Sequence, residues 1–113
     1  MNNISGEFKI KLLGQERVMK ANFQAAEKLE KEVLKREISY VVLQASSYRI
    51  SVTDIIDVIY VGLAANKDTR LKRDEIGEAV IAEGAAGFAP VVIEYLKYFL
   101  TGGKEQVNSD PFQ

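Results

Sequence analysis

The sequence predicts a mainly α-helical fold with a small N-terminal β-hairpin (α+β), in which about five helices pack around a central helix near residues 51–64. Two patterns predict it: apolar residues alternate near the N-terminus, as in a half-buried strand, and then recur at helical spacing. In addition, a chain of 113 residues, 47% hydrophobic and 27% charged, has the size and composition of one domain. We therefore expect a single globular domain over residues 6–102, with flexible tails at 1–5 and 103–113.

The first expected element is the β-hairpin. Phe8, Ile10 and Leu12 alternate with charged residues, which is the period of a strand with one buried face. A turn at residues 13–16 and a weaker strand at 17–21 complete the hairpin. Because a lone hairpin is marginally stable in water, we expect its apolar face to lie on helices.

The first helix is predicted from Asn22, a good N-cap, to about Arg36. Acid-before-base pairs four residues apart, Glu27 with Lys31 and Glu32 with Arg36, each add a few tenths of a kcal/mol. Its basic residues are interleaved with glutamates, which favours a solvated face over a binding patch. The inward side and its edge are predicted to comprise Phe23, Ala26, Leu29, Glu30 and Val33.

A short helix at residues 38–45 is favoured over a strand by the helical spacing of its apolar residues. The central helix follows, with Ser51 as N-cap and Asp54 near its positive end. It is apolar around most of its circumference, so only a stripe through Asp54, Asp57 and Val61 is expected to face water. Its β-branched residues are middling helix formers, so packing by neighbouring helices must stabilise it.

Two more helices are predicted after a polar loop at residues 64–69, where Asn or Asp suits left-handed backbone angles. The first of them begins near Asp74 and ends at Gly84. Residues 84–87 form a small-residue joint; no Gly-Lys-Ser/Thr follows and no strand precedes it, which argues against a phosphate loop. Pro90 suits the first turn of the final helix, and a pair of glycines ends that helix.

The final helix is apolar on nearly all sides, with Glu94 and Lys97 as its only charged residues. The last helix of a small domain usually has one wet side, so this pattern predicts either deep burial or coverage by another molecule. The sequence is compatible with both deep burial and coverage by another molecule. The candidate surface for a partner or for self-association comprises Val91, Tyr95, Tyr98, Phe99, Tyr40 and Leu43.

The residue types argue against an enzyme. The chain has no cysteine and no histidine, so it lacks thiolate nucleophiles, imidazole bases and the usual zinc ligands. Carboxylate pairs such as Asp54 with Asp57 lack a metal-binding spacing and are better explained as charges at a helix start. We expect no catalytic, metal-binding or cofactor-binding residues.

The charge pattern disfavours nucleic acid and membranes as partners. The net charge of -1 produces no field that attracts phosphate backbones or anionic lipid. The strongest basic run, with Lys67, Arg70, Lys72 and Arg73, has no interleaved aromatic residue and no helix-turn-helix pattern. No secretory signal and no stretch of membrane-spanning length is evident, so we expect a cytoplasmic protein. A small helical nucleic-acid-binding regulator that uses the basic run remains an alternative.

Five features follow one another in a characteristic order. They are a Gly-led amphipathic hairpin, Phe23-x-Ala25-x-x-x-Leu29-Glu30, Ser51-x-x-Asp54-Ile55 running to Gly62-Leu63, Ile76-Gly77 to Gly84, and a helix that ends in Leu100-Thr101-Gly102. In this order and spacing they resemble the tail assembly chaperones of phages and gene transfer agents, in particular the tail tube-associated type. The likeness covers about residues 6–103.

The chain departs from the family pattern in the hairpin and in the first helix. Gly14-Gln15 stands where the family tends to have a double glycine, and Val18-Met19 where it tends to have an aromatic residue. Leu34-Lys35 replaces a glycine that is usually found shortly after the Leu-Glu pair. This last change suggests a longer first helix.

The resemblance implies a non-catalytic protein of phage or prophage that binds the long tape measure protein, helps recruit tail tube subunits, and then leaves. Its partners would be the tape measure protein and the tail tube protein. Self-association as a homo-oligomer would multiply weak contacts along an extended client. The protein would act in the host cytoplasm and be absent from the mature virion. A structural or adaptor protein that is retained in the tail is the alternative.

Overall fold

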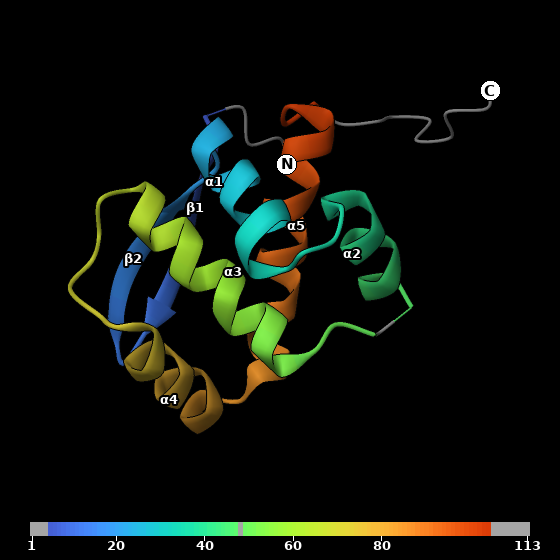
Figure 1. Cartoon of the computed structure of the whole chain (residues 1–113). Coiled ribbons are helices and arrows are strands. Elements are labelled where there is room, and N and C mark those ends of the chain that lie inside the picture. The colour runs from blue at the N-terminus through green and yellow to red at the C-terminus, as the bar shows by residue number, and fades with distance from the viewer. Residues whose placement is uncertain (1–4, 48, 105–113) are drawn as a thin grey trace.

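The computed structural model describes residues 5–47 and 49–104, and this part of the chain folds into five α-helices and a two-stranded antiparallel sheet (Figure 1). The predicted α+β class is confirmed. The elements are β1 (Glu7–Leu12), β2 (Gln15–Lys20), α1 (Phe23–Lys28), the π-helical turn η1 (Leu29–Val33), α2 (Ile38–Ala45), α3 (Val52–Ala65), α4 (Arg73–Glu83), the 3-10 turn η2 (Ala85–Phe88) and α5 (Ala89–Thr101). Most of the two predicted tails, residues 1–4 and 105–113, lies outside the described residues.

The hairpin forms as the alternation predicts, and its apolar face lies on the helices. Its loop is shorter than the predicted turn at residues 13–16, because β2 already begins at Gln15. The two loop residues, Leu13 and Gly14, both have positive φ (54° and 77°), as a tight hairpin turn of type I′ requires. Met19 of β2 is paired with Phe8 of β1, and both side chains are buried on the same face. A Cβ added to Gly62 of α3 would lie 2.8 Å from the Cβ of Met19. Only a glycine therefore lets α3 approach β2 this closely.

The first helix ends earlier than predicted. Asn22 caps α1 as expected and accepts a hydrogen bond of 2.9 Å from the N–H of Ala25. The helix then passes through η1 and ends at Leu34, and Lys35 adopts a left-handed backbone with φ 56°. The predicted continuation to Arg36 is wrong, because the left-handed angles of Lys35 cannot continue a right-handed helix.

Lys35→Gly is expected to stabilise the protein by about 0.5–1 kcal/mol, because glycine adopts left-handed angles without the steric cost that lysine bears. The midpoint of urea unfolding measures this change. Lys31→Gly is the matched control within the helical turn η1, and there the same replacement is expected to destabilise by about 0.5–1 kcal/mol. A lower midpoint for both variants would contradict the assigned backbone of Lys35.

The inward face of the first helix also differs from the prediction. Ala25 and Leu29 are buried, whereas Phe23 is 77% exposed. At 100° per residue, Phe23 and Ala25 lie about 200° apart around the helix, so they cannot both face the core. The prediction is therefore wrong at Phe23, whereas Leu29 is buried and Ala26 and Val33 pack against the core, as predicted.

Of the two predicted ion pairs in this region, only one forms. Lys31 donates to Glu27 at 3.5 Å on the surface. Arg36 lies beyond the end of the helix and pairs with Asp54 of α3 at 2.6 Å instead of with Glu32. The early helix end is the cause, because it removes Arg36 from the helical position next to Glu32.

α3 is the central helix, as predicted, and α1, α4, α5 and β2 all contact it. Ser51 caps it by accepting a hydrogen bond of 3.0 Å from the N–H of Asp54. The predicted wet stripe is only partly correct: Asp54 and Asp57 are partly exposed, but Val61 is 2% exposed. With neighbours on several sides of α3, only a narrow strip of this helix meets water.

The second half of the chain follows the prediction closely. Gly84 ends α4 with φ 96°, η2 forms the joint of small residues, and α5 ends at Gly102 with left-handed φ 67°. In the loop before α4 the left-handed residue is Lys67 (φ 64°), not Asn or Asp as predicted. No single described helix is long and apolar enough to cross a membrane; α4 and residues 85–101 pass that test only together, and they are bent by 105°.

Candidate partner-binding surface

α2 presents two of the predicted surface residues to solvent. Tyr40 is 48% exposed and Leu43 is 67% exposed, and they lie one turn apart on the outward face of the helix. Ile38, Val41 and Ala45 on the other face are buried, and α2 packs beside α5 (Figure 1). Tyr40 and Leu43 therefore present apolar surface that the described part of the chain does not cover.

Tyr95 of α5 does not belong to an exposed surface. Its side chain is fully buried, its hydroxyl donates a hydrogen bond of 2.8 Å to the carbonyl of Lys20, and its ring packs edge-on against Phe8 at 5.6 Å. Burial raises the pKa of the Tyr95 hydroxyl. Its place in the candidate surface is therefore corrected: the hairpin covers this side of α5, which the apolar sequence of the helix does not show.

The other predicted residues of α5 are half-buried. Tyr98 packs against Phe8, with ring centroids 5.9 Å apart, and Phe99 packs against Tyr95 at 5.2 Å. Val91 also packs against the core. These three side chains thus stabilise the fold first and present only a part of their surface to a partner.

Further large apolar side chains are exposed outside the predicted set. Leu100, half exposed, lies one turn after the charged Lys97, and that spacing was the signal that could have placed it on the outward side. The others lie on elements that the sequence assigned to the core or to turns. The additional exposed residues are Leu13, Phe23, Val52, Ile81 and Leu100.

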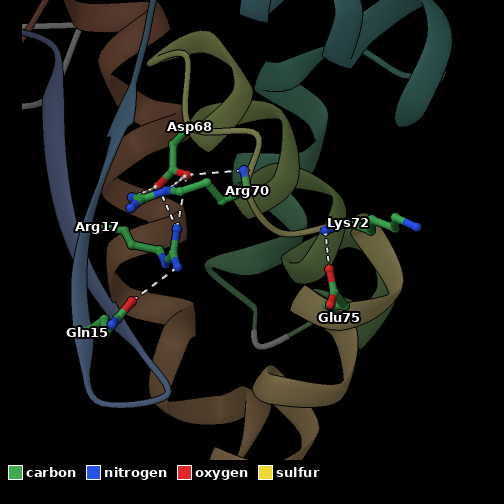
Figure 2. A network of polar contacts seen from close by, with 6 residues as sticks. All are labelled: Gln15, Arg17, Asp68, Arg70, Lys72 and Glu75. Atoms are coloured by element: carbon green, nitrogen blue, oxygen red, sulfur yellow. Dashed lines mark hydrogen bonds and ion pairs between the residues drawn. The ribbon is translucent and has the colours of Figure 1, made fainter.

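Two cations of the basic run, Arg70 and Arg73, are paired with aspartates within the fold, and Figure 2 shows the contacts of Arg70. Arg70 donates to both carboxylate oxygens of Asp68, at 3.1 and 3.3 Å, and Arg17 of β2 does so at 3.0 and 2.8 Å. The hydrogen bond from Arg70 lowers the pKa of the Asp68 carboxyl more than burial raises it, and the hydrogen bond from Arg17 lowers it further. The backbone N–H of Lys72 donates to Glu75 at 2.8 Å.

The two aspartates of α3 have structural partners. Asp57 accepts a hydrogen bond from Arg73, which raises the pKa of that guanidinium. Asp54 pairs with Arg36 and lies in the capped first turn of α3. Across the described residues, no three carboxylates are grouped so that they could hold a metal ion. Both aspartates thus join α3 to neighbouring segments of the chain.

A family model described as phage tail tube protein, GTA-gp10, matches residues 5–102. The chain belongs to this phage tail family. The match spans the hairpin and all five helices, so the family's sequence pattern covers the whole described fold. No curated protein and no solved structure matches the chain. The resemblance to phage and gene transfer agent tail proteins is confirmed at the level of the family, whose description names the tail tube.

Proposed function

We propose that this protein is a non-enzymatic tail assembly chaperone that binds the tape measure protein and helps to recruit tail tube subunits. The observation that carries the proposal is the pair of exposed apolar side chains on α2, Tyr40 and Leu43, in a member of a phage tail family. An amphipathic helix of a long client would cover these side chains with its own apolar face.

The energetics favour many weak contacts along the client. Burying a large apolar side chain gains about 1.5–3 kcal/mol. Ordering two molecules in one complex costs several kcal/mol, so one copy with two such anchors binds weakly. Several copies on one extended client, in contact with one another, reach a useful affinity by avidity. Homo-oligomerisation on the tape measure protein in the host cytoplasm, followed by release before the virion is mature, is part of the proposal.

A structural component retained in the tail is the second candidate, and the description of the family as a tail tube protein favours it. The two functions differ in whether the protein remains in the finished particle. Quantitative proteomics of purified particles separates them: a chaperone is expected at far below one copy per tube subunit. A stoichiometric amount in finished particles would contradict the chaperone function and support the structural one.

Leu43→Gln is expected to reduce co-purification of the tape measure protein at least tenfold, because it removes an exposed apolar anchor while keeping a good helix former. Its thermal unfolding is expected to match that of the parent, since the side chain is 67% exposed. Phe23→Gln, at an exposed aromatic residue of α1, is the matched control and is expected to retain the client. If a folded Leu43→Gln variant retained the tape measure protein fully, the contact with this client would not lie on α2.

A further inference from the structure

A groove of about 300 Å³ lies between the N-terminal half of α3 and α4. α3 contributes Thr53 and Ile56 to it, and α4 contributes Gly77 and Ile81. Ile81 is 58% exposed although it is a large apolar residue on a helix. α4 packs against α3, while α2 packs against α5, so this groove is separate from the exposed face of α2 (Figure 1).

No close contact within the described residues requires a glycine at position 77. It lies in the middle of α4, where glycine costs about 0.5–1 kcal/mol relative to alanine. A Cβ added at this position would meet only side-chain carbons of Ile56, at 3.6 and 3.8 Å, which are ordinary contact distances. The missing side chain instead leaves the wall of the groove open, so that another backbone can approach α4 closely.

The charges around the groove are mainly negative. Asp74 has a 97% exposed carboxylate whose only ion pair in the described structure is a long one of 4.0 Å to Arg73. Glu78 is exposed and forms no ion pair with any described residue. The one cation of the groove, Arg73, is already paired with Asp57. A ligand that covers the apolar wall thus meets Glu78, which has no ion pair with any described residue, and Asp74, whose cation Arg73 is shared with Asp57.

We infer that this groove binds an amphipathic helix of another protein, with an apolar stripe flanked by lysines or arginines. The stripe would cover the exposed Ile81 beside the bare backbone of Gly77, next to the buried Ile56, and the flanking cations would meet Asp74 and Glu78. Such pairing of unlike charges orients a helix and sets its register. The inference goes beyond the proposed function, because it concerns a different surface and holds for a chaperone and for a retained tail component alike.

The test uses the full chain and two synthetic helical peptides with the same leucine stripe, one flanked by lysines and one by glutamates. Amide chemical shifts of the isotope-labelled protein report where each peptide binds. The lysine peptide is expected to shift amides of residues 52–57 and 73–82 and to bind at least tenfold more tightly than the glutamate peptide. Because the charges are exposed, this preference is expected to weaken with added salt.

Two substitutions of the same glycine separate binding from folding. Gly77→Gln fills the groove with the side chain of a good helix former. It is expected to lower the affinity for the lysine peptide at least tenfold. Gly77→Ala is expected to keep the fold, since its Cβ makes only ordinary contacts. The double variant Asp74→Lys and Glu78→Lys is expected to reverse the preference between the peptides.

Three results would overturn the inference. The first is equal affinity of the parent and Gly77→Gln for the lysine peptide. The second is a set of shifts confined to α2. The third is shifts at residues 52–57 and 73–82 that grow with protein concentration when no peptide is present, because a second copy of the chain would then occupy the groove.

Discussion

Asp68→Ala is expected to lower the free energy of unfolding by about 3–5 kcal/mol, the usual cost of removing one partner from a buried ion pair. The side chains of Arg17 and Asp68 are 7% and 8% exposed, so the guanidinium of Arg17 would stay buried without its carboxylate. The pair joins β2 to the loop between α3 and α4, which are far apart in sequence (Figure 2). Urea unfolding at neutral pH measures the loss.

Two control variants show whether the buried charge is the cause. Arg70→Ala removes a cation that is 73% exposed and bound to the same carboxylate, and it is expected to cost less than about 1 kcal/mol. Arg17→Met combined with Asp68→Ala removes both buried charges and is expected to recover most of the loss. The Nε of Arg17 is buried with no hydrogen-bond partner among the described residues, which favours recovery. A double variant as unstable as Asp68→Ala would refute this account.

The Asp68 carboxyl, whose pKa is lowered chiefly by the hydrogen bond from Arg70 and further by that from Arg17, makes stability depend on pH in one direction. The pKa of Asp68 is lowered in the folded protein, so its contribution is fully present above the unfolded value of about 3.9. The contribution is lost as the pH falls through that value toward the folded pKa. The difference in unfolding free energy between the parent and Asp68→Asn is therefore expected to shrink between neutral pH and pH of about 3. If the difference grew on acidification, the lowered pKa of Asp68 in the folded protein would be contradicted.

Gly62→Val is expected to destabilise the protein by about 3 kcal/mol. Its Cβ would lie 2.8 Å from the Cβ of Met19, 3.0 Å from its Cγ and 3.1 Å from its Sδ, so α3 and β2 would have to separate. The Cβ of Met19 is fixed to the strand and cannot rotate away as the end of its side chain can. Thermal unfolding detects the loss, and the hairpin amides should lose protection against hydrogen exchange first.

Another helical glycine is the matched control for Gly62→Val. Gly77→Ala is expected to stabilise the protein by about 0.5–1 kcal/mol, because alanine favours the helix and its Cβ meets only ordinary contacts. Opposite effects at the two glycines would show that the approach of α3 to Met19, and not helix propensity, determines the outcome at Gly62. Equal stabilisation at both positions would mean that the hairpin does not lie this close to α3.

The sequence could predict part of the candidate surface. Apolar spacing places Leu43 in a helix, but whether it faces the core or water depends on which side α5 covers. Tyr95, in contrast to Leu43, is covered by its neighbours. The hairpin encloses its ring, and the carbonyl of Lys20 accepts a hydrogen bond from its hydroxyl. In this helix only Glu94 and Lys97 mark an exposed side, and apolar residues all around the rest of it do not show which of them a neighbour covers. The groove beside Gly77 had no signal at all, because it arises where two separate helices meet.

The sequence by itself determined the local structure: the alternation of Phe8, Ile10 and Leu12 for the strand, the caps at Asn22 and Ser51, and the glycines that end the last two helices. These features depend on side chains within a few residues of one another, so they can be identified from the sequence alone. The tertiary structure alone decided that Lys35 ends the first helix, that Arg17 is buried against Asp68, and that Phe23 faces water. The burial of Arg17, for example, depends on a carboxylate 51 residues away, and local spacing carries no information about such a contact.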